Sequence, residues 1–385
     1  MRISFQRSRI ESQIKLTETQ IRWFRFRRSG LAEPFSSPEE AAHLLVGVQA
    51  QILPAAGLAL WNRTRGLTYA DFDGRLHVRR SLIKLWGQRG TLHVYASDEW
   101  PLLNGAMVGR HSWWERQIVR AGTGPDAYQA TLDRVAELLR QRGTMGRNDL
   151  RASGLDLDEA CFNPWGGIFA DLVRRGVACH AGQAGNEKLF AHREYWLPDL
   201  AWNPPPADEA NIELARRYLR TYGPVTLHDL IYWRGALVDN ARRCIAEMSD
   251  EVVEVSVRGQ AMLALRADLD ALNEKPPARR EWPVRMLYRF DPLLLGIKDK
   301  AWLMEPRFYK RVFRPAGHIE GTLLDASRGR VVGTWRYDRA DSGLAITVYP
   351  FTPLPRQLRK AVEENAIGVA QFFGLPLNDL VMDGV

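Results

Sequence analysis

The chain has little cysteine and no long apolar run, and these absences exclude several classes of protein. Its three cysteines, Cys161, Cys179 and Cys244, lie far apart in 385 residues, and none belongs to a CxxC pair. A disulfide framework or a zinc site needs more ligands at closer spacing. No segment approaches the roughly 20 apolar residues that cross a bilayer. We therefore expect buried free thiols, no metal and no membrane contact.

The sequence also lacks targeting and common catalytic motifs. Residues 1–13 are basic but contain no apolar signal-peptide stretch, which predicts a cytoplasmic protein. There is no GxSxG, HExxH or P-loop motif, and no GxGxxG motif after a strand. These absences favour a chemistry that needs neither a metal nor a nucleotide, so we expect no cofactor.

The sequence carries an excess of positive charge. The formal net charge is +8 and the pI about 9.5, and arginine greatly outnumbers lysine. The planar arginine fork suits phosphates and base edges. Arginine enrichment also follows from a GC-rich genome, so charge alone leaves nucleic-acid binding open.

The first 120 residues change from helical to extended patterns. Helical patterns cover residues 17–28, 37–48 and 54–61, and the second begins with a serine cap and a proline. Two extended runs, 82–86 and 89–95, flank a glycine-containing turn. Three helices followed by a hairpin are the order of a winged helix.

The middle of the chain contains an internal repeat. One amphipathic helix ends at Gly143 and another at Gly223, and a Leu-Arg pair stands four residues before each glycine. Six residues after each glycine, Asp149 and Asp229 begin a second helix. Two ordinary helix pairs could match by coincidence, but the shared register favours two copies of a helix-turn-helix unit. A third helix and a hairpin follow in each copy.

Two proline-rich linkers, at 203–206 and 274–283, separate these units. The last hundred residues contain a hairpin with its turn at 327–329, a further strand and a closing amphipathic helix from Pro355 to Phe373. We therefore expect an α+β protein with tandem winged-helix units around a concave DNA-binding surface. The predicted units are residues 16–120, 126–200 and 207–272, followed by a β-rich C-terminal domain at 283–385.

Gln49-Ala50-Gln51 is the short stretch most suggestive of chemistry. In an extended segment, residues two apart share one face, so both amides could hold one water. Taken alone, such a stretch is more often a capping or core-edge feature. It is followed about forty residues later by Arg89-Gly90-Thr91-Leu92-His93.

Together these two motifs resemble the AlkZ/YcaQ-like family of DNA glycosylases, and the resemblance spans residues 16 to 375. Further similar stretches are Leu16-Thr17, Arg28-Ser29-Gly30-Leu31, Phe290-Asp291-Pro292-Leu293-Leu294-Leu295-Gly296, Lys310-Arg311-Val312-Phe313-Arg314-Pro315 and Val331-Val332-Gly333-Thr334-Trp335-Arg336.

The resemblance implies a Gln-x-Gln catalytic motif at Gln49 and Gln51. A sister branch has Asp at the second position. Gln51 therefore places the chain on the branch associated with bulky adducts and interstrand crosslinks, although the middle residue, here Ala50, is usually larger. Glutamine cannot act as a base at neutral pH, but its carbonyl can orient water and direct a dipole at positive charge. That suits alkylated purines, whose glycosidic bond is already weak.

Several other residues are candidates for DNA contact, each with a plainer alternative. Arg89, Thr91 and His93 either approach the lesion or clasp the hairpin. Arg63 and Arg65 either contact phosphates or complement a helix end. Trp113-Trp114 either wedges into the base stack or packs in the core. Asp291 is more consistent with a turn than with an active-site acid. Arg311, Arg314 and Arg336, in the C-terminal motifs, complete the predicted DNA-binding set.

We expect a monofunctional DNA glycosylase that acts as a monomer on duplex DNA containing alkylated purines, and that joins the nucleoid when bound to DNA. The sequence admits either a housekeeping role or self-resistance to a DNA-alkylating natural product. The alternative is a non-catalytic winged-helix regulator. Such a regulator would have no use for two amides facing the DNA and would usually dimerise on a palindrome.

Overall fold

The structure is a computed structural model that describes residues 14–107, 113–120, 122–325 and 329–383. Within these ranges helices and strands are mixed along the chain, and the strands form three sheets. The fold is α+β, as predicted. No helix in the described ranges has both the length and the apolar character needed to cross a bilayer.

Three segments of the chain share one order of elements and are called repeats here. The first repeat covers residues 38–96. Its elements are α2 (Pro38–Leu44), β2 (Val48–Gln49), α3 (Leu53–Trp61), α4 (Tyr69–His77), β3 (Leu82–Trp86) and β4 (Leu92–Ala96). Helix α4 was not predicted; Thr68 caps it by accepting a hydrogen bond from the Asp71 amide. The prediction also extended α2 too far, because Val46 and Gly47 adopt positive φ of 56° and 86° and end the helix.

The second and third repeats contain the glycines that the sequence aligned. The second consists of α7 (Pro125–Arg142), β5 (Thr144–Gly146), α8 (Arg147–Arg151), α9 (Gly167–Arg174), β6 (Ala178–Ala184) and β7 (Glu187–His192). The third consists of α11 (Ala207–Tyr222), α12 (Leu227–Arg234), α13 (Val238–Glu247), β8 (Val252–Val257) and β9 (Gln260–Leu265). Gly143 and Gly223 each donate their N–H to the leucine carbonyl four residues earlier. The carboxylates of Asp149 and Asp229 accept from backbone amides at the start of α8 and α12. The predicted equivalence of the two helix ends is confirmed.

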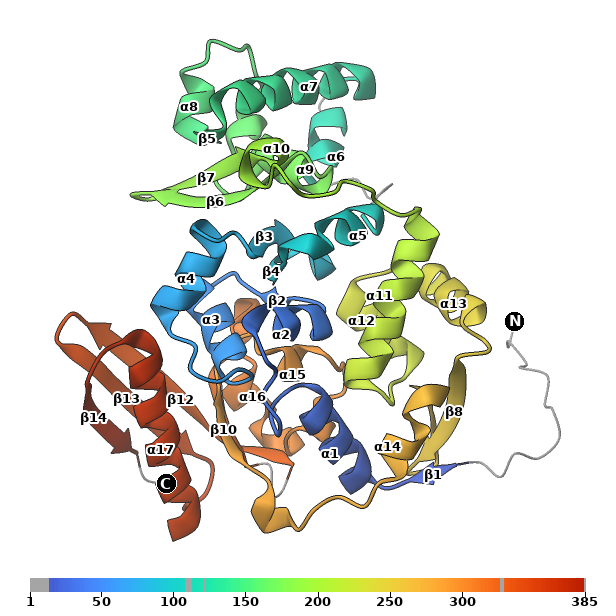
Figure 1. Cartoon of the computed structure of the whole chain (residues 1–385), viewed down its shortest axis with the longest axis vertical. Helices are drawn as coiled ribbons and strands as arrows, with labels where there is room; N and C mark the ends of the chain where they lie inside the picture. Colours follow the sequence, from blue (N-terminus) through green and yellow to red (C-terminus); the bar gives the residue numbers. More distant parts are fainter. Residues whose placement is uncertain (1–13, 108–112, 121, 326–328, 384–385) are drawn as a thin grey trace.

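One strand pairing recurs in all three repeats. The extended residues after the first helix pair with the second strand of the hairpin: β2 with β4, β5 with β7, and Val225 with Leu263 of β9. The hairpins of the first two repeats also join, because Lys84 of β3 pairs with His180 of β6. Their six strands therefore form one sheet, ordered β2-β4-β3-β6-β7-β5, which runs up to the second repeat at the top of Figure 1.

The C-terminal region is built on a five-stranded sheet, as its predicted β-rich character requires. The strands are β10 (Val284–Leu287), β11 (Gly321–Asp325), β12 (Arg330–Ala340), β13 (Gly343–Pro350) and β14 (Leu377–Met382), and α17 (Arg356–Phe373) packs beside them. Leu58, Phe72, Ile346 and Phe372 belong to one buried cluster, so α3, α4 and this region share a core. Ser327 and Arg328, in the predicted hairpin turn, lie outside the described residues.

The N-terminal helix α1 (Glu18–Arg28) does not join the first repeat, which corrects its place in the predicted three-helix order. β1 (Lys15–Leu16) pairs in parallel with β8, and α1 packs against α11 and α14 (Leu269–Asn273). The short helices α5 (Trp100–Gly105), α6 (Trp113–Arg120) and α10 (Arg193–Trp196) connect the repeats. The side chains of Trp113 and Trp114 lie outside the description. All three cysteines are free and buried, as predicted.

Candidate active site

Gln49 and Gln51 share the face of the chain opposite the core. Val48 and Ala50 alternate with them and are fully buried in the cluster that contains Leu58 and Phe372. In extended backbone this alternation turns both glutamines the other way. Gln51 is exposed, whereas Gln49 is only 8% exposed. The expectation of two open amides is therefore met by Gln51 alone.

The amide of Gln49 is held by Arg89. The Nη2 of Arg89 donates to the Oε1 of Gln49 over 2.8 Å. Arginine has donors only, so the amide must turn its oxygen toward Arg89 and its NH₂ group away. The sequence left Arg89 open between DNA contact and a structural clasp, and the structure places it as a clasp.

Arg89 is in turn fixed by α12. Its Nη1 donates to the carbonyl oxygen of Trp233 over 2.8 Å. A Cβ on Gly235, which ends α12 at φ 63°, would lie 3.0 Å from the Arg89 Cα. Only glycine therefore allows this approach, which links the first repeat to the third beside the Gln-x-Gln motif. Burial lowers the pKa of Arg89, and nearby tyrosines, Tyr232 first, oppose that shift.

His93, on strand β4, is a buried residue of the β3–β4 hairpin. It stands opposite Gln49 in the β2–β4 register, and its Nδ1 donates to the carbonyl oxygen of Thr91 over 3.0 Å. The ring is 4% exposed, and burial, followed by the charge of Arg89, lowers its pKa to about 3. The imidazole is thus neutral and internal, which favours the structural clasp over DNA contact for His93. Thr91 is half-buried, and its hydroxyl donates to the carbonyl oxygen of Gln88.

Lys300 is a neighbour of the site that the sequence analysis missed. Its Nζ donates to the carbonyl oxygen of Ile297 and lies 4.8 Å from the centre of the Tyr232 ring. Burial lowers its pKa to about 7, while Asp229 opposes that shift and Arg89 adds to it. A single lysine in a loop carries no sequence signal, because only the packing of α12 against this loop buries it.

Arg63 is not a DNA-binding residue, contrary to prediction. It is fully buried and forms two hydrogen bonds of 2.8 Å with the carboxylate of Asp291. Its Nε donates to the carbonyl oxygen of Ser29. Asp291 also accepts from the amide of Leu293 at the start of α15 (Pro292–Leu295), which confirms its predicted place in a turn. The two residues that the sequence set apart form one internal ion pair.

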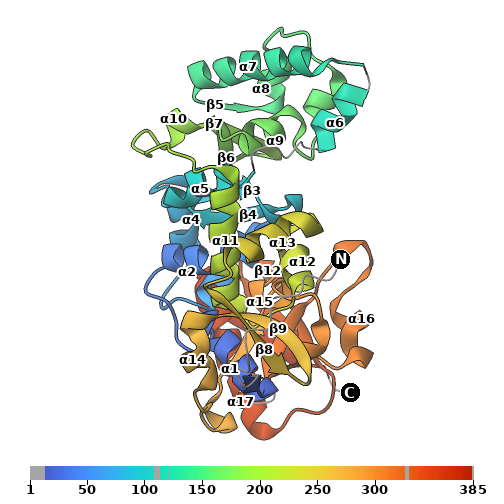
Figure 2. The ribbon, with the colours of Figure 1, turned by 90° about the vertical axis from the view of Figure 1, so that its right-hand side faces the viewer.

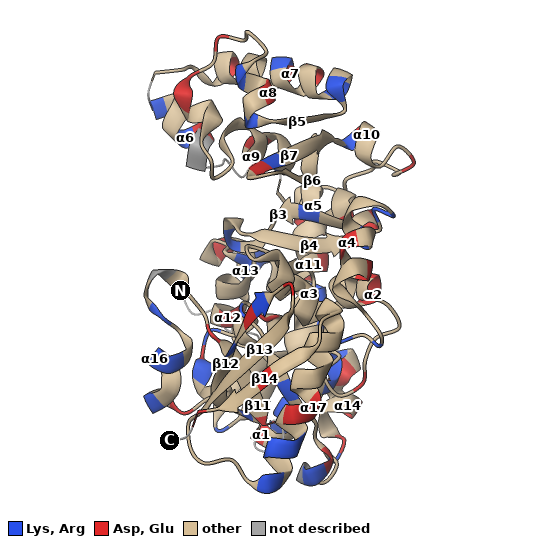
Figure 3. Ribbon diagram, turned by 90° about the vertical axis from the view of Figure 1, so that its left-hand side faces the viewer, with Lys and Arg blue, Asp and Glu red and all other residues tan. Residues whose placement is uncertain are grey.

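The remaining predicted arginines are exposed. Arg65 follows α3, and Arg311 belongs to α16 (Tyr309–Val312), whose basic residues lie at the edge of the ribbon in Figure 3. Arg314 and Arg336 both approach the carboxylate of Glu320, at 3.4 and 2.6 Å. Burial opposes ionisation of Glu320, but the hydrogen bonds from Arg336 outweigh it and lower the pKa. The anchored arginines remain half-exposed and available to phosphates.

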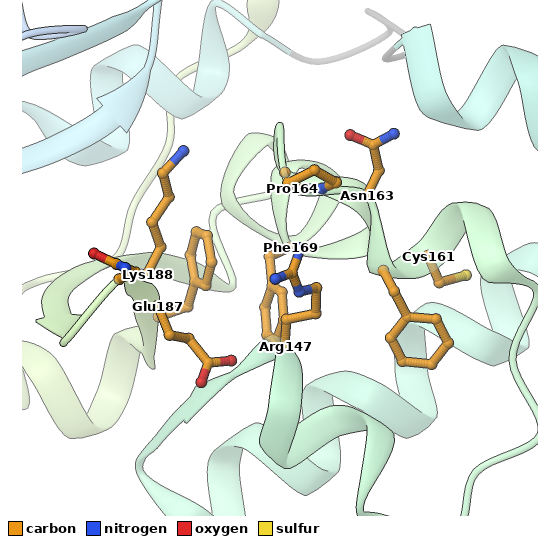
Figure 4. A pocket seen from close by; sticks show the side chains of 11 residues that line it. Arg147, Cys161, Asn163, Pro164, Phe169, Glu187 and Lys188 are labelled. Atoms are coloured by element: carbon orange, nitrogen blue, oxygen red, sulfur yellow. The ribbon is translucent and has the colours of Figure 1, made fainter.

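A small cavity lies elsewhere, in the second repeat between α8, α9 and the β6–β7 hairpin. Arg147, Phe169, Glu187 and Lys188 are among its lining residues (Figure 4). Its volume is about 80 Å³, well below the several hundred Å³ of ordinary ligand pockets. Neither glutamine nor Arg89 lines it, so it is not part of the Gln-x-Gln site.

Comparison with known proteins matches almost the whole chain. A family model described as DNA glycosylase AlkZ-like matches residues 42–372. The interstrand DNA cross-link repair glycosylase of Streptomyces sahachiroi is 30% identical over 378 residues, 94% of this chain and 98% of that protein. The solved structure of Streptomyces sahachiroi DNA glycosylase AlkZ superimposes with a TM-score of 0.81 at 28% identity, over 95% of this chain and 99% of that one.

A DNA-acting N-glycosylase is the class of enzyme that this fold and these matches define. The chain belongs to the AlkZ-like DNA glycosylase family. Its substrate is therefore DNA, and the alternative of a non-catalytic regulator is not favoured.

Proposed function

We propose that this glycosylase removes alkylated purines from duplex DNA and that Gln49 and Gln51 carry the chemistry. The observation that carries this proposal is the unequal pair of amides: Gln51 is exposed, and Gln49 beside it is fixed by Arg89. N7-alkylguanine is the simplest substrate. The likeness to the Streptomyces interstrand DNA cross-link repair glycosylase supports interstrand crosslinks as well, and we extend the proposal to bulky adducts.

The two amides have different roles in the hydrolysis of the glycosidic bond. Water attacks C1′ of the sugar as the C1′–N9 bond breaks, and the bonding electrons pass to the purine, whose alkylation made it cationic. The products are the free alkylpurine, an abasic sugar with a hydroxyl at C1′, and one proton released to solvent. The exposed Gln51 carbonyl accepts a hydrogen bond from the attacking water. The carbonyl dipole of Gln51 faces the developing oxocarbenium charge, while Gln49, whose oxygen accepts from Arg89, keeps this segment in position. No basic side chain is needed because the leaving group is already activated.

The architecture supports DNA binding by three tandem winged-helix units. Each repeat has the order helix, short strand or bridge, helix, helix and hairpin, with the same strand pairing. We place the DNA on a concave surface next to Gln51. The exposed Arg65, Arg311, Arg314 and Arg336 contact phosphates there, and the protein acts as a monomer.

The test is release of the base from a defined duplex. The protein is incubated with one duplex that contains a single N7-methylguanine and another with a nitrogen-mustard interstrand crosslink, and alkali then cleaves the abasic sites. We expect cleavage at the modified guanine of both. If the folded protein cleaves neither duplex, the proposed substrate class is contradicted. If it cleaves only the first duplex, its substrates are restricted to monoadducts.

A further inference from the structure

The loop between α12 and α13 exposes apolar side chains next to the catalytic motif. Leu237 is 75% exposed and Val238 is 41% exposed, whereas the neighbouring apolar residues of α13, such as Ile245, are buried. A single exposed leucine on a protein surface needs no explanation. Its place in the structure is what distinguishes Leu237.

Leu237 is tied to Gln49 through Arg89. Gly235 lies so close to the Arg89 backbone that a Cβ on it would be 3.0 Å from the Arg89 Cα, and Arg89 holds the amide of Gln49. Leu237 follows Gly235 by two residues, so its Cα lies within about 7 Å of the Gly235 Cα. The exposed leucine thus extends from the segment that clamps the catalytic amide. Helices α12 and α13 pack against each other, as Figure 2 shows.

The second repeat has a comparable feature. Trp165, just before α9, is 77% exposed, and α9 is the third helix of its repeat as α13 is of the third. In helix-turn-helix proteins the N-terminal residues of the recognition helix meet the base edges. Both repeats therefore present a large apolar side chain where such a unit faces DNA.

We propose that Leu237 inserts into the base stack beside the alkylated nucleotide and holds the duplex open while the lesion faces Gln51. This rests on the proposed function. A glycosylase must expose the sugar C1′ to water, and apolar side chains that enter between base steps unstack them. A leucine replaces part of the lost stacking without needing a hydrogen-bond partner. Val238, the next residue, is also exposed.

The experiment compares Leu237→Ala with wild type on two duplexes. In the first, the N7-methylguanine is paired with cytosine; in the second, it stands opposite an abasic site, where it is already poorly stacked. We expect Leu237→Ala to release base at least tenfold more slowly from the paired duplex and within threefold of wild type from the unpaired one. Ile367→Ala, which truncates an exposed apolar residue of α17 that is 48% exposed, is the control and should match wild type on both.

A second measurement follows the unstacking itself. A 2-aminopurine is placed next to a non-hydrolysable 2′-fluoro analogue of the lesion, and its fluorescence should rise when wild type binds but not when Leu237→Ala binds. The proposed insertion of Leu237 would be overturned if Leu237→Ala and wild type released base at equal rates from the paired duplex. It would also be overturned if the variant lost the same fraction of the rate on both duplexes. Failure of wild type to release base from either duplex would contradict the proposed function instead.

Discussion

Arg63 and Asp291 form a fully buried ion pair in which two guanidinium nitrogens each lie 2.8 Å from a carboxylate oxygen. The pair joins the end of α3 to the start of α15, 228 residues apart in the sequence. Both groups have left water, so the pair stabilises the fold only while both partners are present.

Arg63→Ala should therefore destabilise the protein strongly. The change leaves the Asp291 carboxylate buried without its cation, which costs about 3–5 kcal/mol of the free energy of unfolding. Urea denaturation measures the loss. Arg65→Ala, two residues further on and exposed, is the matched control and should change stability by less than about 0.5 kcal/mol. Equal stabilities for the two variants would show that the ion pair does not support the fold.

Gln51→Ala should slow base release without weakening DNA binding. An amide that orients the attacking water acts mainly in the transition state, so we expect at least a tenfold fall in single-turnover rate, about 1.4 kcal/mol of barrier. Affinity for a duplex with a non-hydrolysable lesion should stay within twofold of wild type. Full-rate excision by this variant would remove Gln51 from the mechanism.

Gln49→Ala should combine a catalytic and a structural defect. Gln49 is buried and accepts from a cationic donor, so its loss leaves the Arg89 Nη2 without this partner and costs about 1–3 kcal/mol of stability. Gln51→Ala, at an exposed position, should unfold at nearly the wild-type midpoint. Thermal unfolding of the two variants side by side measures the difference, and identical melting temperatures would argue against the Arg89 clasp.

The buried histidine makes stability depend on pH. The pKa of His93 falls from its ordinary 6.5 to about 3 in the folded state, so the unfolded chain binds more protons between these values. Stability is then complete above pH 6.5 and is lost as pH falls, by about 2 kcal/mol at pH 5 from this residue. His93→Gln should flatten the slope of unfolding free energy between pH 5 and 7. Burial also lowers the pKa of His180, so His180→Gln should account for part of the remaining slope. An unchanged slope in both variants would refute this account.

DNA binding should weaken steeply with salt, because bound arginines displace condensed counterions. Arg311→Ala removes one exposed cation of α16 and should reduce the slope of log affinity against log salt by about one. Fluorescence anisotropy between 50 and 200 mM salt, about a fourfold range, is sufficient to see it. Arg356→Ala on α17 serves as the exposed control. A slope unaffected by Arg311→Ala would place the DNA elsewhere.

Much of the local structure could be predicted because local rules govern it. Capping chemistry places residues at helix ends by local rules. It accounts for the serine before α2, the glycines that end α7 and α11, and the aspartates in the first turns of α8 and α12. The missed helix α4 has its capping threonine, but its apolar positions were too few to indicate a period.

The candidate site was predictable only in part. The motif placed Gln49 and Gln51 on one face, because strand alternation is a local property. It could not show that Gln49 is held by Arg89, or that Arg63 and His93 are buried, because each outcome depends on residues distant in sequence. An arginine at a helix end has the same sequence environment whether it faces a phosphate or a buried aspartate.

The core shared by α3, α4 and α17 has a consequence for how the chain is made. Phe372 packs within 2.8 Å of where a Cβ on Gly57 would lie, so the first repeat closes over a helix synthesised about three hundred residues later. During synthesis on the ribosome, the apolar face of α3 therefore stays uncovered until almost the whole chain has emerged. The buried cluster of the second repeat, which also includes Ile83, Leu85 and Tyr95 of the β3–β4 hairpin, draws only on residues 83–196 and can form while translation continues. Synthesis therefore passes through an intermediate in which the second repeat is folded and the segment that carries Gln49 and Gln51 is not yet supported.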